Sequence, residues 1–140
     1  MTTANRGKSA EKSVDAVLKK WNNLAAFAYH RLPDARSARG ALAAQPADFY
    51  FCSKGVFGHL EVKETEHEYR LAKDKVSQLA ILKKFSMAGA VSLVLVHHST
   101  LKKWRVLYAG GLASDVPSWD LREVQTYDSA EDALVATGYF

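Results

Sequence analysis

The chain has 140 residues, 48% of them hydrophobic, which is enough for one hydrophobic core and predicts a single domain over residues 1–140. Its 19 Lys and Arg residues against 15 Asp and Glu give a net charge of +4, too small an excess to indicate a nucleic-acid partner by itself. Its only cysteine, Cys52, which we expect to be buried, excludes an internal disulfide, and without a long apolar run or an apolar leader we expect a cytoplasmic protein with no membrane partner.

The N-terminal part predicts a helix, a strand and a loop. Over residues 9–21 the apolar residues recur at helical spacing, at Ala10, Val14, Val17, Leu18 and Trp21. Glu11 lies at the edge of this buried face. Residues 25–32 are typical of a strand, and residues 33–45, rich in Ser, Gly and Arg, are typical of an exposed loop.

Residues 46–63 predict a β-hairpin. Lys54 and Gly55 suit the two central residues of a tight turn, and this turn fixes the register of the two strands. In that register Asp48 lies directly opposite Glu61. Two acidic residues are therefore expected to face each other near the open end of the hairpin.

Side-chain alternation places Asp48, Glu61 and Lys63 on one face of the hairpin. The opposite face carries the apolar residues Phe49, Phe51, Leu60 and Val62. Facing carboxylates repel each other unless a divalent cation lies between them. Oxygen ligands with a lysine beside them indicate magnesium-dependent phosphodiester hydrolysis. The alternative is that both acids are surface residues at strand ends and that the lysine pairs with Glu61 or Glu64.

The next segment predicts a polar connection and a helix. Residues 64–74 are polar and are expected to be irregular. Asp74 can cap a helix that runs to about residue 88 and ends at Gly89. On this helix Gln78 shares an inward stripe with apolar residues, so its amide needs a partner.

The last third predicts two strands and a helix. Residues 90–96 form an aliphatic run typical of a strand covered on both faces, and residues 104–108 are expected to be its antiparallel neighbour. Between them, His97 and His98 are expected in a turn. Ser129 is the expected cap of the closing helix, which stops at Gly138. The order α-β-β-β-α-β-β-α indicates an α/β fold, a mixed β-sheet flanked by helices.

Four sequence elements occur in an order that resembles the PD-(D/E)xK nuclease superfamily and, within it, RecU-type Holliday-junction resolvases. The elements are Asn5-Arg6-Gly7 with Glu11, the strand at Asp48, the block Glu61-Val62-Lys63-Glu64-Thr65, and Gln78-Leu79. The resemblance implies a restriction-endonuclease-like fold. It also implies a homodimer, from a bacterium or a phage, whose two active sites nick opposed strands of a four-way DNA junction.

The resemblance also assigns roles to individual residues. Asp48 and Glu61 are expected to bind Mg²⁺, for which Mn²⁺ can substitute, and Val62 is counted with these ligands. Glu11 would reach the metal directly or through water. Lys63 would orient the attacking water or stabilise charge on the phosphoryl group, and Gln78 would hydrogen-bond that water or Lys63. A helix-edge acid and a buried amide satisfied by the backbone are the alternatives for Glu11 and Gln78.

Basic residues near these elements are expected to contact DNA phosphates: Arg6, Arg31, Arg36, Arg39, Lys73 and Lys75. The leading hypothesis is therefore a magnesium-dependent, structure-selective endonuclease that resolves branched DNA by paired nicks. Two alternatives remain open. One is a nickase or restriction-like endonuclease of the same superfamily, and the other is a DNA-binding module with this fold and no turnover.

Overall fold

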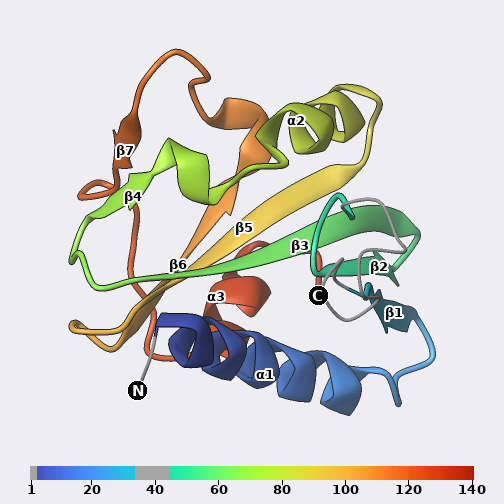
Figure 1. Ribbon diagram of the computed structural model, residues 1–140. Helices are drawn as coiled ribbons and strands as arrows, with labels where there is room; N and C mark the ends of the chain where they lie inside the picture. The colour runs from blue at the N-terminus through green and yellow to red at the C-terminus, as the bar shows by residue number, and fades with distance from the viewer. Residues whose placement is uncertain (1–2, 34–44) are drawn as a thin grey trace.

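A five-stranded mixed sheet forms the centre of the molecule and has helices on both faces (Figure 1). The computed structural model describes residues 3–33 and 45–140, with the side chains of the first helix from residue 8 onward. The helices are α1 (Thr3–Trp21), α2 (Leu79–Met87) and α3 (Ala130–Ala136). The strands of the central sheet are β1 (Phe27–Arg31), β2 (Phe49–Ser53), β3 (Val56–Thr65), β5 (Val91–His98) and β6 (Lys103–Tyr108).

The sheet order is β1-β2-β3-β5-β6, so the longest strand, β3, lies at its centre. Strands β1, β2 and β3 pair antiparallel, β3 and β5 pair parallel, and β5 and β6 pair antiparallel. The parallel pair requires a crossover, and the segment that carries α2 supplies it. The predicted α/β mixed sheet flanked by helices is confirmed.

The β2–β3 hairpin has the predicted turn. Lys54 has φ 51° and Gly55 has φ 84°, so both central residues have the positive φ of a type I′ turn. Ser53 consequently faces Val56, and the pairing continues in this register to Phe49 opposite Leu60. The register expected from the sequence is therefore confirmed along the whole of β2.

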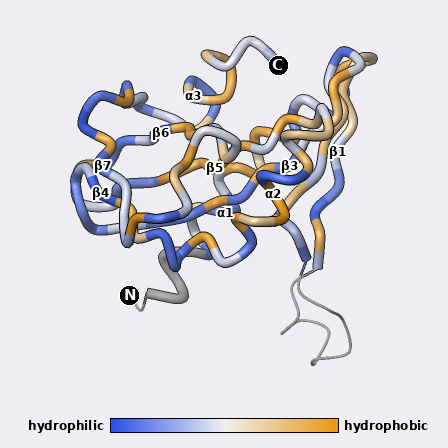
Figure 2. Tube along the Cα trace, turned by 90° about the horizontal axis from the view of Figure 1, so that it is seen from above, coloured by the Kyte–Doolittle hydropathy of each residue, from blue (hydrophilic) through white to orange (hydrophobic). Residues whose placement is uncertain are grey.

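Two hydrophobic clusters pack on the two faces of the sheet. One lies under α1 and α3 and includes Val14, Leu18, Phe49, Phe51, Leu60, Leu93, Leu95 and Leu134. The other lies under α2 and includes Leu71, Leu79, Leu82, Val94, Val96 and Leu107. Alternate residues of β5 enter the two clusters, and Figure 2 shows hydrophobic residues along this strand. Strand β5 is thus covered on both faces, as its aliphatic run predicted.

The connection between β3 and α2 differs from the prediction. Residues 64 and 65 extend β3, and a short strand β4 (Arg70–Ala72) pairs with β7 (Ser118–Asp120) in a second, two-stranded sheet. Asp74 does not cap α2, because it lies in the 3₁₀-helix η1 (Lys73–Lys75). Helix α2 begins at Leu79 with Gln78 as its N-cap residue. A second 3₁₀-helix, η2 (Ala109–Gly111), follows β6.

The C-terminal end of α2 and both ends of α3 agree with the sequence. Gly89, with φ 107°, follows α2, and Gly138, with φ 83°, follows α3. The Ser129 Oγ accepts a 3.0 Å hydrogen bond from the Asp132 backbone N–H, which is the predicted N-cap. Within the described ranges, none of the helices combines the length and the apolar character needed to cross a membrane.

Two further sequence predictions were wrong. Cys52 is exposed, because helix α2 packs on β5 and leaves this side of β2 open. His97 and His98 do not form a turn but are the last two residues of β5, opposite Trp104 and Lys103 of β6. Strand β5 therefore extends two residues beyond the C-terminal end of its aliphatic run.

Candidate active site

Asp48 lies immediately before β2, where the chain leaves the regular ladder. Its N–H donates to the Leu60 carbonyl at 3.1 Å, although Leu60 already faces Phe49. Its carbonyl accepts from the Leu32 N–H, on the β1 side, at 2.8 Å. In a regular strand both groups of one residue point to the same side, so the backbone is kinked at Asp48, as in a β-bulge. Bulges beside active sites re-aim side chains in this way.

The kink brings the Asp48 carboxylate into the opening between β2 and β3. Its Oδ2 accepts a 2.7 Å hydrogen bond from the Val62 N–H, and its side chain hydrogen-bonds the carboxyl group of Glu61. The N–H and C=O of one strand residue point to the same side, so the Val62 carbonyl also faces this opening. The Val62 side chain is apolar and packs in the cluster under α1, which leaves the carbonyl as its only metal-binding group.

Glu61 is 6% exposed and carries a strongly perturbed carboxyl group. Burial, followed by the hydrogen bond and the charge of Asp48, raises the pKa of Glu61 to about 9, and Lys63 opposes this rise. Its Oε1 lies 3.7 Å from the Lys63 Nζ. The raised pKa therefore favours the neutral form of the Glu61 carboxyl group beside Asp48, as expected for a buried acid next to a second acid.

This donor set fits a hard divalent cation. Two carboxylates and a backbone carbonyl supply only oxygen atoms, which magnesium prefers, and a cation could replace the proton of Glu61. In the described part of the chain, no three acidic, histidine or cysteine side chains form a ready-made metal cluster. The remaining coordination positions would fall to water and substrate oxygens, which is the usual arrangement for magnesium.

Glu11 lies on α1 and is held by Arg31, the last residue of β1. The Arg31 Nε and Nη2 donate to the Glu11 Oε1 at 3.1 and 2.8 Å. Arg31 faces Phe49, the residue after Asp48, so this ion pair lies at the same edge of the sheet as the two acids. Arg31, predicted to contact DNA, is thus engaged with the acid predicted to reach the metal.

Gln78 was predicted to lie inside a helix, but in the structure it precedes the first residue of α2. It is the half-buried N-cap residue of α2, and its backbone carbonyl accepts from the Leu82 N–H at 3.0 Å. Its proposed contact with water or Lys63 stays a prediction.

The predicted DNA-contact residues fall into two groups. Lys73 and Lys75 are in η1, where their Nζ atoms donate to the carbonyls of Ser114 at 2.6 Å and Glu64 at 3.0 Å. These bonds attach η1 to its neighbours. The other residues cannot be placed in the same way: Arg36 and Arg39 lie outside the described residues, and Arg6 is in α1 with its side chain outside the description.

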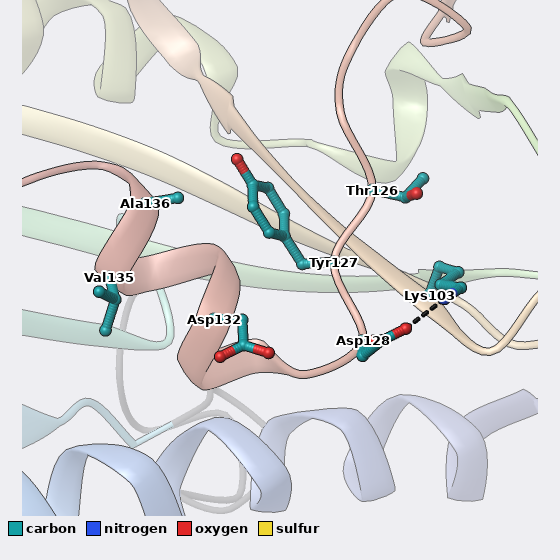
Figure 3. Close-up of a pocket in the computed structure, with 7 residues that line it drawn as sticks. All are labelled: Lys103, Thr126, Tyr127, Asp128, Asp132, Val135 and Ala136. Atoms are coloured by element: carbon teal, nitrogen blue, oxygen red, sulfur yellow. Dashed lines mark hydrogen bonds and ion pairs between the residues drawn. The ribbon is translucent and has the colours of Figure 1, made fainter.

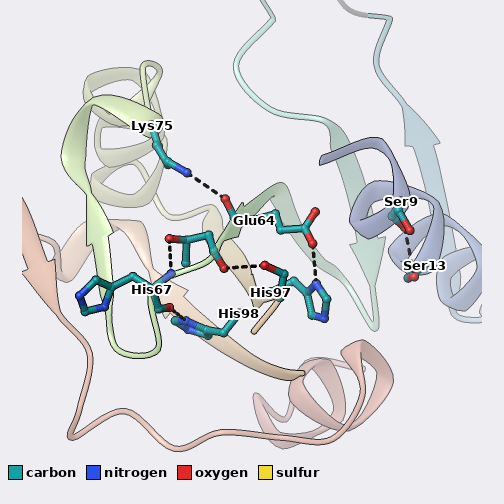
Figure 4. A network of polar contacts seen from close by, with 9 residues as sticks. Ser9, Ser13, Glu64, His67, Lys75, His97 and His98 are labelled. Atoms are coloured by element: carbon teal, nitrogen blue, oxygen red, sulfur yellow. Dashed lines mark hydrogen bonds and ion pairs between the residues drawn. The ribbon is translucent and has the colours of Figure 1, made fainter. Parts of the chain in front are cut away.

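Sequence reasoning missed a polar network behind the candidate site (Figure 4). The Glu64 Oε1 lies 3.0 Å from the His97 Nδ1, and the His97 ring packs on Trp104 at 4.7 Å between centroids. The other oxygen, Glu64 Oε2, is buried without a hydrogen-bond partner among the described residues. Glu64 was visible in the sequence as the residue after Lys63, but only the β3–β5 pairing reveals its partner.

A second part of this network is centred on His98, which is fully buried. Its Nδ1 donates to the His67 carbonyl at 2.7 Å, and its Nε2 accepts from the Arg105 Nη1 at 3.0 Å. The contact with Arg105 requires the neutral ring, because Nε2 must accept there, and burial lowers the pKa of His98 accordingly. Arg105 also donates to the carbonyls of Glu68 and Val124, so the pair holds the segment after β3 against β5 and β6.

A pocket of about 400 Å³ lies elsewhere, between the start of β6, residues 126–128 and α3 (Figure 3). Lys103 and Asp128 form an ion pair at its rim. Neither Asp48 nor Glu61 lines this pocket, so it is separate from the candidate site.

Comparison with solved structures finds proteins of similar fold. The fold is similar to that of Hjc from Archaeoglobus fulgidus, a Holliday junction resolvase from an archaeal hyperthermophile, with a TM-score of 0.53 and 21% identity. The match covers 93% of this chain and 99% of that chain. No protein-family model and no curated protein matches the sequence. At this level of identity the likeness shows a shared fold, which confirms the predicted restriction-endonuclease-like class.

Proposed function

We propose that this chain is a divalent-metal-dependent endonuclease that cuts branched DNA at a centre formed by Asp48, Glu61 and Lys63. The observation that carries the proposal is a hydrogen-bonded pair of acids, Asp48 and Glu61, the second only 6% exposed, with the Lys63 Nζ 3.7 Å from Glu61. Burying these ionisable groups together destabilises the folded chain. Groups with perturbed pKa values are concentrated at functional sites. The fold shared with a resolvase adds independent support.

Asp48, Glu61 and the Val62 carbonyl would hold Mg²⁺ or Mn²⁺, with Glu11 joining directly or through water. The bound cation supplies charge neutralisation for the phosphate and activation of water for in-line attack. Glu61 must lose its proton for this arrangement, so metal affinity should rise with pH. The Arg31 side chain keeps Glu11 extended toward this edge of the sheet.

Lys63 is the residue placed to act on the reacting groups. Its ammonium group lies beside Glu61 and its side chain is 27% exposed, so it would reach a bound phosphate or the attacking water. Gln78 would orient the same water by hydrogen bonding. The network of Glu64 and His97 fixes the end of β3 next to Lys63, which keeps the lysine in position.

The proposed substrate is a four-way DNA junction, cut by paired nicks from a homodimer. The RecU-type sequence elements support this choice, and the structural neighbour is itself a Holliday junction resolvase. Arg6, Arg36, Arg39, Lys73 and Lys75 would contact phosphates around the site. Hydrolysis in which the 3′ oxygen is the leaving group would yield nicks that DNA ligase can seal.

The test compares a labelled four-way junction with a linear duplex of the same sequence, each with Mg²⁺ or with EDTA. We expect cleavage of the junction only with metal. Asp48→Asn and Glu61→Gln should lower the cleavage rate by at least about 100-fold, because the metal contributes several kcal/mol of transition-state stabilisation. Both variants should still bind the junction, since neither change adds negative charge near the phosphates.

Glu123→Gln is the matched control, because Glu123 is exposed and distant in sequence from the site. It should cleave as the wild type does. Preferred cleavage of linear duplex would favour the nickase or restriction-like alternative. Junction binding without metal-dependent cleavage by the wild type would favour the inactive DNA-binding module and would contradict the proposal.

A further inference from the structure

Helix α1 carries most of the net charge of the molecule. Its 19 residues include five basic and two acidic side chains, a balance of +3 in a chain whose total is +4. The remaining 121 residues are therefore almost neutral. The positive charge is concentrated on one element, which is the arrangement that distinguishes a binding surface from a generally solvated one.

Three of the basic residues form one line along the outer side of the helix. Lys8, Lys12 and Lys19 are all exposed. At 3.6 residues per turn they fall within about 40° of one another around the axis, and at 1.5 Å per residue they extend over about 16 Å. We call these three residues the lysine stripe. A line of this length matches about five phosphate steps along one strand of a duplex, at about 3.4 Å per step.

The acids of α1 do not neutralise the lysine stripe. Asp15 borders it, but its Oδ1 accepts a 2.9 Å hydrogen bond from the Tyr29 hydroxyl on β1. Glu11 accepts from Arg31, and the helix's fourth lysine, Lys20, pairs with Glu131 of α3 at 2.8 Å. Among the residues that the structure describes, no acid forms an ion pair with a member of the stripe.

The N-terminal part of the lysine stripe opposes the local electrostatics of a helix, whereas Lys19 lies in the last turn, where the helix dipole favours positive charge. Lys8 and Lys12 are four residues apart, where like charges destabilise a helix by about 0.2–0.5 kcal/mol. The first turn of α1 contains no acid, although the helix dipole favours negative charge there. A sequence that keeps such repulsion at an exposed face is typical of a functional surface, because a bound polyanion would relieve it.

The lysine stripe adjoins the candidate site. Lys12 follows Glu11, Glu11 pairs with Arg31, and Arg31 faces Phe49, the residue after Asp48. The outward positions between the lysines are Ser9, Ser13 and Ala16, and the apolar residues of α1 are used in the core. This face therefore lacks the large apolar side chains with which amphipathic helices enter a lipid surface.

From these observations, and resting on the proposed nuclease function, we propose that the lysine stripe binds the sugar–phosphate backbone of a duplex arm of the DNA substrate. Lys8, Lys12 and Lys19 would hold the arm along α1 while the strand to be cut reaches Asp48 and Glu61. The contact would not depend on base sequence, because lysines that bind phosphates do not contact the bases. It should therefore strengthen binding to any DNA that places a duplex arm along α1.

The test compares two triple variants of the full chain that have the same net charge. One replaces Lys8, Lys12 and Lys19 by Gln, and the control replaces three exposed lysines on other elements, Lys54, Lys84 and Lys102, by Gln. Junction affinity is measured by fluorescence anisotropy in EDTA over a range of salt concentrations. Each lost phosphate contact should reduce the slope of log K against log salt by about 0.9, so the stripe variant should lose about 2–3 in slope.

The stripe variant should also bind about tenfold or more weakly at low salt, whereas the control should keep the wild-type slope. Circular dichroism checks that both variants are folded, and Lys12→Gln alone should reduce the slope by about 1. Equal slopes in the two triple variants, with a wild type that binds and cleaves junctions, would overturn the stripe proposal and leave the nuclease function standing. A stripe variant that loses binding to anionic vesicles but not to DNA would also overturn it.

A wild type that neither binds nor cleaves junctions would instead contradict the proposed function itself. The two failures are distinguishable, because only the second removes binding and cleavage together from the unmodified chain.

Discussion

At the scale of single residues, the candidate site is defined by two hydrogen-bonded acids, one of which is buried. Glu61 is buried in the central strand, and its neighbour Asp48 is held against it by the Val62 N–H. Burial alone would favour the neutral form of Glu61, and the charge of Asp48 favours it further. The folded chain without metal therefore binds a proton that the unfolded chain releases, and its stability must depend on pH.

The sign of this dependence follows from the two pKa values. The pKa of Glu61 is about 9 in the folded chain, against an ordinary value of 4.5. Between these limits the unfolded chain binds fewer protons, so the stabilising contribution present below pH 4.5 is lost as pH rises toward 9. In EDTA, the wild type should lose stability with rising pH by on the order of 1 kcal/mol per unit.

Glu61→Gln, which has no proton to release, should flatten this slope and be more stable than the wild type at about pH 8. Urea unfolding at several pH values measures the effect, and Glu123→Gln serves as the control that keeps the wild-type slope. Parallel stability curves for Glu61→Gln and wild type would show that the pKa of Glu61 is not raised in the folded chain.

The residue-scale predictions from sequence succeeded where local rules act. The turn at Lys54 and Gly55 correctly predicted the register of β2 and β3 as far as Phe49 opposite Leu60, next to Asp48 and Glu61. The kink at Asp48 was not predictable, because it depends on hydrogen bonds to both neighbouring strands. The pairing of Arg31 with Glu11 joins β1 to α1 and likewise has no signature in local spacing.

At the scale of elements, β3 is the frame of the site. It carries Glu61 and Lys63, pairs with β2 on one side and with β5 on the other, and packs against α1. Gly58 lies in β3 opposite Phe51 and Val91. A Cβ atom there would meet the Val91 carbonyl oxygen at 2.5 Å and the Phe51 ring at 2.4 Å. The approach of three strands therefore requires glycine at this position.

Gly58→Ala should accordingly destabilise the fold by about 1–3 kcal/mol, the range for overpacking, since the backbone oxygen of Val91 cannot rotate away. Gly111→Ala is a matched control, because a Cβ at Gly111 meets no atom within 4 Å. Chemical unfolding measures both. A Gly58→Ala variant as stable as the Gly111→Ala variant would show that β3 does not have this close packing.

The elements that sequence analysis missed are short or depend on distant contacts. Strands β4 and β7 have three residues each and pair across more than 40 positions, so neither shows an alternating pattern of its own. Asp74 was expected to cap α2, because Asp is a common N-cap residue. The chain instead forms a 3₁₀ turn there, which the hydrogen bonds of Lys73 and Lys75 to carbonyls of other segments hold in place. Long periodic segments such as α1 and β5 were predictable because their patterns are internal.

At the scale of the whole molecule, one chain presents one candidate centre. A four-way junction has paired strands of like polarity, so paired nicks require two centres related by a two-fold axis. A chain of 15.5 kDa can supply the second centre only through another copy. The proposed junction resolution therefore predicts a homodimer, at least when DNA is bound.

This symmetry makes a test with mixed dimers informative. Wild-type chains mixed with Glu61→Gln chains that carry a distinct affinity tag give heterodimers with one active centre, which two-step purification isolates. On a plasmid with an extruded cruciform, the wild-type dimer should give linear product, because both strands are cut while it remains bound. The heterodimer should give nicked circles, since its Glu61→Gln centre lacks an anionic metal ligand. The Glu61→Gln homodimer should leave the plasmid supercoiled, and heterodimers of wild type with Glu123→Gln should give linear product.

If sedimentation instead shows a monomer both free and bound to the junction, one chain cannot make paired cuts, and a nickase acting on single strands becomes the better account of Asp48, Glu61 and Lys63.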